Sequence, residues 1–286
     1  MNNERIVVLT DELLDRKGAR KMSEIPHEVI ELLQKGQLQT VNLTEWLAVD
    51  HVTLLQHVLD ELGLAEESSP IIRRVSNLAD KKVMKIIPAI ALEWKVLLDS
   101  RSVGDSSTEL YKSELYVTLA QHHSDSVRCW AAYIIGQDQR MSVHDKLVNI
   151  RPFAADSHFG VREIAWMALR EDIINNLIEF IHYLSDWVHD EDANIRRYAI
   201  ELTRPQGVWA KHIIALKENP QLALPLIESV LSDPAKYVQD SVSNWLNDAS
   251  KTNPEWVKQI CQQWLKISDT KETKRIVTRG QRSLAK

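Results

Sequence analysis

Three side chains that can carry charge recur along one predicted helix. Arg197, Glu201 and Arg204 are spaced by four and then three residues, which places them on one face of an α-helix. Pro205 ends that helix, and Trp209 lies just beyond it. A carboxylate between two cations, close to an aromatic ring, is more typical of a recognition surface than of a core. The alternative is a set of ordinary ion pairs on a solvated helix face.

The helix that carries these residues belongs to an internal repeat. In each copy a branched apolar residue follows an Asp within a few residues and precedes Arg or Gln and an apolar helical pattern. The branched residues are Val127, Val161, Ile195 and Val238, at intervals of 34, 34 and 43 residues. The Asp can cap the helix, and the branched residues can pack against neighbouring copies. This pattern is typical of HEAT-like helical pairs, so the sequence predicts an all-α solenoid.

Alignment of the repeats places more polar residues on the face that carries Arg197. The interval of 34 residues places Glu163 at the first position of the stripe and Arg170 at the third. The interval of 43 residues places Asn244 at the second position, and Trp166 lies one helical turn from Glu163. Because the inner helices of a solenoid build its concave surface, these residues predict a polar stripe on that surface.

The arginine of the repeat itself has a simpler explanation. Arg128, Arg162 and Arg196 directly follow the branched residue in three copies. We expect these three side chains to form ion pairs along the stack rather than to contact a ligand.

The first part of the chain is less regular. Apolar residues three and four apart predict helices over residues 27–36, 40–63, 80–100 and 107–121. Polar and Ser-rich stretches predict connectors at residues 64–70 and 101–107. We expect an N-terminal helical cap over residues 1–105 and HEAT-like repeats over residues 106–286, joined in one continuous domain.

Composition excludes several classes of protein. Eight Gly and nine Pro in 286 residues are too few for the many tight turns of an all-β protein. Cys129 and Cys261 have no metal-ligand spacing, so we expect free thiols in a reducing compartment, no metal and no cofactor. The chain shows neither a signal peptide nor an apolar run of membrane-spanning length. These observations predict a cytoplasmic protein that does not bind membranes.

Charge is distributed unevenly along the chain. The net charge is −5, but residues 271–286 hold six cations against Glu272 alone, which leaves a surplus of acidic residues elsewhere. Such a basic C-terminal helix could bind a polyanion while acidic outer helices keep the protein soluble. The alternative is a solvated helix end without a ligand.

Three segments resemble one family of enzymes. Residues 195–209 resemble the Arg-Arg…Glu-x-x-Arg-Pro…Trp signature of AlkC-type alkylation-repair DNA glycosylases. Residues 238–248 resemble the Val-x-x-Ser-Val-x-Asn-x-Leu-Asn-Asp run of the same family, and residues 276–286 fit its basic last helix. The related AlkD branch shares the HEAT-like fold.

The resemblance implies an activity and a partner. It implies hydrolysis of the N-glycosidic bond of cationic alkylated bases in double-stranded DNA, by a monomer that does not flip the base. A cationic base is a good leaving group, so the enzyme has mainly to stabilise an oxocarbenium-like sugar and position water. Two alternatives stay open: a catalytically inactive HEAT-repeat protein that binds damaged or branched DNA, and a protein-binding scaffold.

The resemblance also implies roles for individual residues. Glu201 matches the active-site Glu of the family, and Trp209 matches its active-site Trp. Residues 159–163 resemble the AlkD-type Trp-x-x-x-Asp, with Phe and Glu in place of Trp and Asp. The AlkC-type Glu-Phe-Ala-Ile-Arg would fall on residues 166–170, where Trp166 replaces Glu. Asn244 lies where AlkD-type members place a Trp.

Together these assignments predict one site. The expected catalytic carboxylates are Glu163 and Glu201. The side chains expected to line the lesion are Phe159, Trp166 and Trp209. The residues expected to bind DNA are Arg197, Arg204, Arg170, Asn244, Lys274, Arg275, Arg279 and Arg282.

Overall fold

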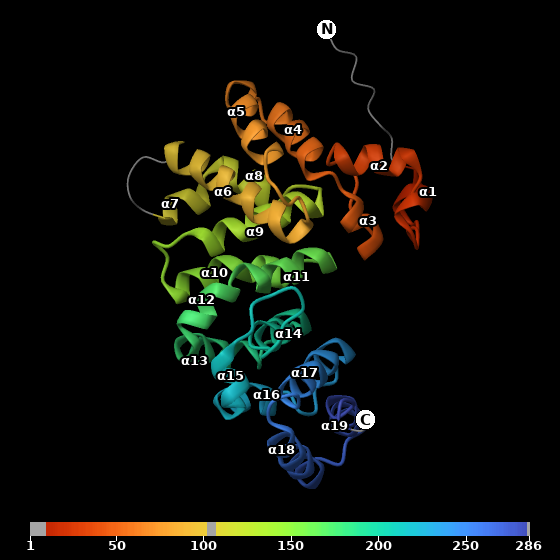
Figure 1. The fold of residues 1–286 in the computed structure, drawn as a ribbon, viewed down its shortest axis with the longest axis vertical. Helices are drawn as coiled ribbons and strands as arrows, with labels where there is room; N and C mark the ends of the chain where they lie inside the picture. Colours follow the sequence, from red (N-terminus) through yellow and green to blue (C-terminus); the bar gives the residue numbers. More distant parts are fainter. Residues whose placement is uncertain (1–9, 102–106, 285–286) are drawn as a thin grey trace.

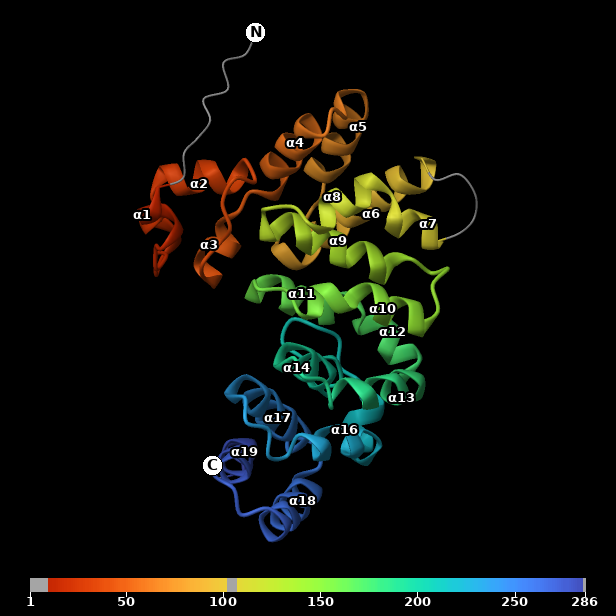
Figure 2. The same ribbon diagram turned by 180° about the vertical axis from the view of Figure 1, so that it is seen from behind.

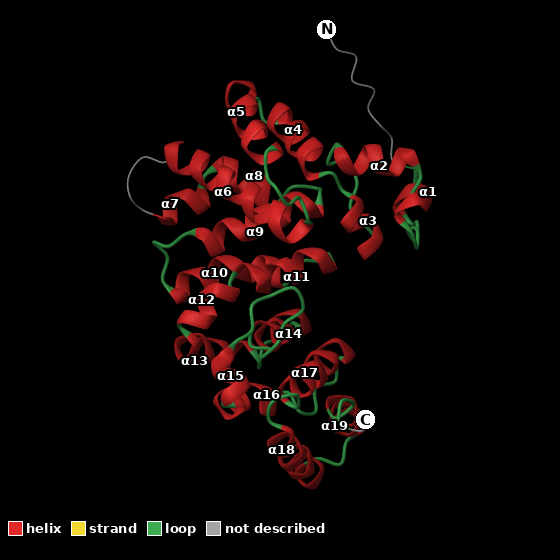
Figure 3. Ribbon diagram, viewed as in Figure 1, coloured by secondary structure: helices red, strands yellow, loops and turns green. Residues whose placement is uncertain are grey.

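The computed structural model describes residues 10–101 and 107–284. Its helices are stacked one after another along the longest axis of the molecule (Figure 1). Five of them contact one another in order and form what we call the inner column. The inner column consists of α9 (Asp125–Gln137), α11 (Phe159–Ala168), α14 (Ala193–Leu202), α17 (Lys236–Ala249) and α19 (Lys271–Gly280). The described residues include no strand (Figure 3), so the predicted all-α solenoid is confirmed.

A second layer of helices packs on one side of the inner column. In Figure 1 this layer lies to the left of the column, and Figure 2 shows the same two layers from behind. The layer consists of α10 (Val143–Ala154), α12 (Arg170–Asn175), α13 (Leu177–Trp187), α15 (Ile214–Glu218), the 3₁₀ turn η2 (Pro220–Ala223), α16 (Leu224–Ser229) and α18 (Pro254–Ile267). In both views these outer helices lie on the same side of the inner column.

The N-terminal helices sit at one end of the column. They are α1 (Asp11–Leu14), the 3₁₀ turn η1 (Met22–Glu24), α2 (His27–Gln34), α3 (Leu43–Ala48), α4 (His51–Glu61), α5 (Ala65–Ser76), α6 (Val83–Arg101), α7 (Ser107–Lys112) and α8 (Glu114–Ala120). Helices α6 and α8 both pack on α9 and so extend the stack.

The branched residues of the repeat explain why the helices stack. Val127, Val161 and Val238 are 0% exposed and Ile195 is 1% exposed, so every one of the four repeat positions lies in the core. Burial of an aliphatic side chain of this size stabilises the fold by about 1.5–3 kcal/mol. The repeat in the sequence thus marks the positions at which successive helices of the inner column pack in the core.

Two of the repeat arginines form the expected ion pairs. Arg128 and Arg196 each donate from Nη1 to the carbonyls five and six residues earlier, at the turn before the helix. Each also pairs with an Asp of the next repeat, with Nε–Oδ2 distances of 2.8 Å to Asp156 and 2.6 Å to Asp233. The expected ion pairs are confirmed for these two residues. Among the described residues Arg162 has no carboxylate partner, because the equivalent Asp190 pairs with Arg151.

The structure corrects the N-terminal predictions in three places. The predicted helix 107–121 is two helices, α7 and α8, because the Ser113 side chain accepts from the N–H of Tyr116 and starts α8 anew. The predicted helix 40–63 is two helices, because the Asp50 side chain accepts from the N–H groups of Val52 and Thr53 and starts α4 anew. The predicted connector 64–70 is wrong, since it forms the first turns of α5, where Glu66 and Glu67 suit the positive end of the helix dipole. The predicted connector 101–107 falls largely on residues 102–106, outside the described residues.

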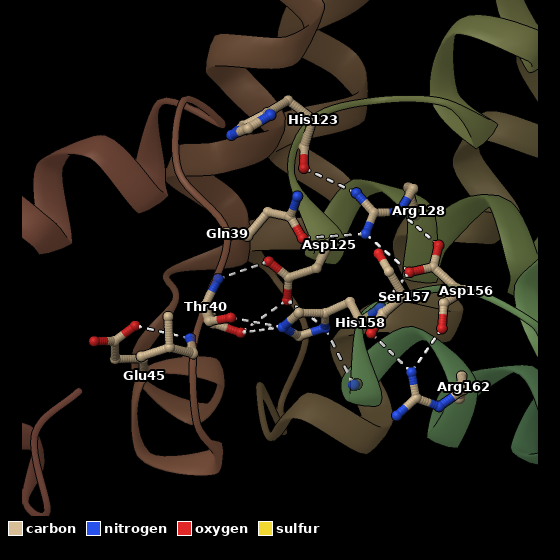
Figure 4. Close-up of polar contacts among 12 residues, drawn as sticks. Gln39, Thr40, Glu45, His123, Asp125, Arg128, Asp156, Ser157, His158 and Arg162 are labelled. Carbon is tan, nitrogen blue, oxygen red and sulfur yellow. Dashed lines mark hydrogen bonds and ion pairs between the residues drawn. The ribbon is translucent and has the colours of Figure 1, made fainter. Parts of the chain in front are cut away.

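A buried polar cluster joins the N-terminal segment to the inner column (Figure 4). The N–H and hydroxyl of Thr40 donate to the two carboxylate oxygens of Asp125, at 3.0 and 2.9 Å. His158 Nδ1 accepts from the N–H of Gly160 at 3.1 Å, so Nε2 carries the proton and donates to the Thr40 carbonyl at 2.6 Å. Gly160 also leaves room for Trp46, whose Nε1 would lie 2.9 Å from a Cβ at this position. Helix α3 is thereby held against the start of α11.

We expect Asp125→Ala to destabilise the protein by about 2–4 kcal/mol, because the buried N–H of Thr40 would lose its acceptor. Asp145→Ala is the matched control, since Asp145 also lies in the first turn of a helix but is exposed. Urea unfolding of both variants measures the difference. Equal losses would contradict a specific role for the contact between Thr40 and Asp125.

Candidate functional site

Alternating charges cross the inner column from α11 to α17. We call this arrangement the charge chain; its members are Glu163, Arg197, Glu201, Arg204 and Asp248. Arg197 lies between the two glutamates: its Nη2 is hydrogen-bonded to Glu163 Oε1 and lies 3.7 Å from Glu201 Oε1. Burial lowers the pKa of Arg197, but the two carboxylates outweigh burial and raise it. The guanidinium is therefore a permanent cation between two anions.

Glu163 is the member of the charge chain that solvent can reach. Its side chain is 34% exposed, whereas those of the other members are 10% exposed or less. One carboxylate oxygen pairs with Arg197, and the other accepts from Trp166 Nε1 at 2.9 Å. These two bonds hold the carboxylate in one orientation while leaving part of it open to a ligand.

Glu201 is buried and fully bonded. Its Oε1 accepts from the Ser241 hydroxyl at 2.7 Å, and its Oε2 accepts from Arg204 Nη1 at 3.0 Å. Burial raises the pKa of Glu201, but the charges of Arg197 and Arg204 and the bond from Ser241 outweigh burial, so the pKa is lower than usual. Glu201 is therefore ionised and acts as the anchor of the two arginines.

Arg204 is also internal, with 8% of its surface exposed. Its Nε and Nη2 lie 2.9 and 2.8 Å from Asp248 Oδ2, in addition to the bond from Nη1 to Glu201. These contacts use the donors that were expected to hold a DNA phosphate. We therefore assign Arg204 to the framework of the site.

Arg170 holds the loop that follows α14. It is 2% exposed, and its guanidinium donates to the carbonyls of Lys211, Leu202 and Arg204 at 2.7, 2.7 and 2.5 Å. Burial lowers the pKa of Arg170 to about 10, so the side chain is still charged at neutral pH. The expected DNA contact of Arg170 is replaced by a role inside the protein, which fixes the path of the loop.

The loop presents Trp209 to solvent in an unusual backbone conformation. Trp209 is 55% exposed, and its φ of 57° lies in the left-handed region, which costs a bulky residue roughly 1–3 kcal/mol. Nearby, Gly207 packs on the ring of Trp166, with only 3.1 Å from a Cβ at Gly207 to the nearest ring atoms. Trp166 is 1% exposed, so it supports the loop and Glu163 rather than lining an open surface.

Phe159 lies at the start of α11, one turn before Glu163. It is half-buried, and its ring centroid lies 4.6 Å from that of His158, which belongs to the buried polar cluster around Thr40 and Asp125. The side chain thus borders the site at the end where α3 packs.

Lys274, Arg275 and Arg279 lie on α19, and Arg282 follows it. We call these four predicted DNA-binding residues the α19 cations. Arg275 and Arg279 both pair with Asp240, at 2.7 and 3.2 Å, and Arg282 donates to Asn244 Oδ1 at 2.9 Å. Lys274 instead pairs with the fully exposed Asp269 at 2.6 Å. The α19 cations are therefore exposed or half-exposed and in part neutralised by carboxylates.

One member of the charge chain and two residues that contact it were not among the predicted site residues. The Tyr237 ring lies 4.2 Å from the Cζ atom of Arg197, Ser241 bonds Glu201, and Asp248 ends the chain. Ser241 and Asp248 fall within the 238–248 run that resembles the family, but their types alone gave no reason to choose them. Tyr237 directly precedes the repeat position Val238, and no spacing rule marks it.

The described residues hold neither a cluster of metal ligands nor a membrane-spanning helix. No group of three or more His, Cys, Asp or Glu side chains in that part of the chain could hold a metal ion. Among the same residues, no helix has the length and apolar character needed to cross a membrane.

We expect Glu201→Gln to destabilise the protein by about 3–5 kcal/mol at neutral pH, because two buried arginines would lose an anion. The folded-state pKa of Glu201 is depressed, so its contribution is present above the unfolded value near 4.5 and is lost as pH falls. The difference in unfolding free energy between wild type and variant should therefore shrink below about pH 4.5. A difference that does not change between pH 7 and pH 3 would contradict this assignment.

Comparisons with known proteins place the site in context. Residues 161–279 match the family described as DNA alkylation repair enzyme, and this segment holds the whole charge chain. The chain is also 37% identical over 97 residues to the uncharacterized protein YhaZ of Bacillus subtilis (strain 168). That match covers 34% of this chain and 27% of YhaZ.

Two solved structures share the fold. The alkylpurine DNA glycosylase AlkC of Pseudomonas fluorescens, bound to DNA containing an abasic site analog, matches with a TM-score of 0.65 and 21% identity. The match covers 82% of this chain and 63% of AlkC, so the chain spans less than two thirds of that protein. AlkD2 of Streptococcus mutans matches with a TM-score of 0.56 and 23% identity, over 76% of this chain and 98% of AlkD2. Residues 161–279 are thus similar to the family of DNA alkylation repair enzymes, and the two solved structures show the same fold.

Proposed function

We propose that the protein is a DNA glycosylase that hydrolyses the N-glycosidic bond of cationic alkylated bases in duplex DNA. The observation that carries this proposal is Glu163, a partly exposed carboxylate of the inner column that is held on both oxygens. Through Trp166 it is joined to the loop that presents Trp209. The family match and the fold shared with AlkC support the same conclusion.

The chemistry requires little acid catalysis. When the bond between the sugar C1′ and a cationic base breaks, both electrons go to the base, which leaves neutral, and the sugar becomes an oxocarbenium-like cation. A fixed carboxylate stabilises that cation electrostatically, and water then attacks C1′ and releases a proton to the carboxylate or to solvent. Glu163 can act in this way because its orientation is fixed before substrate binds.

The two predicted catalytic carboxylates have different roles in this proposal. Glu163 faces the substrate, whereas Glu201, which is 2% exposed, positions Arg197 and Arg204. Arg197 is 6% exposed and holds Glu163 rather than reaching for the DNA backbone. A buried anion bound to two cations and a hydroxyl is not available to activate water.

The remaining surfaces account for the binding of DNA. Trp209 offers an exposed ring that can stack on the lesion or its sugar, and a cationic base adds a cation–π attraction. Arg275, Arg279 and Arg282 can exchange their protein partners for phosphate oxygens. Because the aromatic ring is already at the surface, we propose that the base stays in the DNA during the reaction. We further propose a cytoplasmic monomer, with the buried thiols of Cys129 and Cys261 reduced.

We expect Glu163→Gln to lower the single-turnover release of methylated bases by at least about 100-fold, because the amide lacks the charge that stabilises the sugar cation. Affinity for the duplex should stay within about threefold, since a phosphate contact is not lost. Glu179→Gln, on the outer helix α13, is the matched control and should behave as wild type.

The same assay decides between the proposed function and its alternatives. The substrate is duplex DNA treated with a methylating agent, and the readout is free methyladenine and methylguanine. A wild-type protein that binds this DNA with a clear dependence on salt but releases no base would be an inactive DNA-binding relative. Absence of salt-dependent binding would instead favour a protein-binding scaffold.

A further inference from the structure

One position of the repeat is occupied by Arg128, Arg162, Arg196 and Gln239. At all four, the side chain donates to the two carbonyls five and six residues earlier. This bond closes the turn before each helix of the inner column. Glutamine performs the same task as arginine at this position, so the task does not need a positive charge.

The partners of Nε and Nη2 distinguish Arg162 from the other two arginines. Arg128 and Arg196 pair with an Asp of the next repeat, whereas the equivalent residue for Arg162 is Asp190. Asp190 pairs with Arg151 instead. Within the part of the chain that the structure describes, Arg162 has no carboxylate within 4.0 Å, and its Nη2 makes no hydrogen bond.

The charge of Arg162 lies beside the proposed active site. Its Nε donates to the Tyr237 hydroxyl at 3.3 Å, and its Cζ lies 5.2 Å from the centroid of the Tyr237 ring. The same ring lies 4.2 Å from the Cζ of Arg197, whose own charge is balanced by Glu163 and Glu201. Arg162 is half-exposed and shares the Tyr237 ring with the arginine that holds Glu163, so an unbalanced cation lies close to the proposed reactive carboxylate.

We propose that Arg162 binds a phosphate of the DNA backbone next to the damaged nucleotide; the inference rests on the proposed function and adds a contact to it. The Nη2 group and the outer edge of the guanidinium can donate to phosphate oxygens. The bonds from Nη1 to two carbonyls and the Tyr237 ring already hold the side chain, so binding costs little rotamer entropy. A phosphate held here would fix the position of the adjoining sugar relative to Glu163.

The repeat supplies both the test and its control. Arg162→Gln keeps the turn-closing bonds, as Gln239 does naturally, and removes only the charge. Arg196→Gln makes the same substitution at an equivalent residue whose charge is paired with Asp233. Affinity for an undamaged duplex is measured against KCl concentration for both variants and for wild type, together with the Tm of each protein. Arg162→Lys, which keeps the charge, is measured in the same way.

We expect Arg162→Gln to weaken binding about tenfold and to reduce the salt slope by about one, with little change in Tm. Arg162→Lys should restore most of the slope. Arg196→Gln should lower Tm by roughly 5–10 °C and leave the slope unchanged. A wild-type salt slope for Arg162→Gln, or an equal loss of slope in Arg196→Gln, would overturn this inference. Neither result would contradict the proposed release of bases. Absence of DNA binding by wild type would overturn the proposed function as well.

Discussion

The site depends on one constraint: a charge buried in a protein must be balanced by a charge or by hydrogen bonds close to it. The charge chain satisfies this constraint by alternation, in which Glu201 balances Arg197 and Arg204, and Asp248 balances Arg204 from the other side. Removal of any one member takes a balancing charge away from its neighbours in a medium of low dielectric constant. The packing of α11, α14 and α17 is therefore coupled to the geometry of the site.

The same constraint separates residues that hold the site from residues that can react. The inner members of the charge chain have their charges balanced inside the protein, so a charged ligand gains little from them without breaking those ion pairs. Glu163, at the end of the chain, keeps part of its carboxylate in solvent. Asp248, at the other end, is 5% exposed, so exposure to solvent rather than residue type distinguishes Glu163 from the other two carboxylates. The strained loop at Trp209 fits this pattern, because Arg170 holds its backbone from inside while the ring stays outside.

The repeat could be predicted from the sequence because its contacts are periodic. The buried positions Val127, Val161, Ile195 and Val238, and the all-α fold, follow from residue types at fixed intervals. The break between α3 and α4 was missed, because an apolar pattern continues through the Asp50 cap that starts a new helix. Local caps compete with periodicity, and only the competition decides where a helix ends.

The site could be predicted only in part. Spacing placed Glu163, Arg197 and Glu201 near one another, since they lie on adjacent helices in register. Spacing could not show that Arg170 turns inward, because its partners are carbonyls of a loop that has no repeat. The sequence also could not show that Arg162 lacks a carboxylate partner, because the equivalent Asp190 pairs with Arg151 in the folded protein. Both cases depend on which of two possible partners a charged group finds in three dimensions.

The central claim is that Glu163 stabilises positive charge on the sugar. It is tested most directly by comparing two duplexes that differ only in the sugar analogue at one site: a cationic pyrrolidine and a neutral tetrahydrofuran. We expect wild type to bind the cationic analogue at least about tenfold more tightly, and Glu163→Gln to remove this preference. Equal affinity of wild type for the two duplexes, or a preference that Glu163→Gln retains, would contradict it.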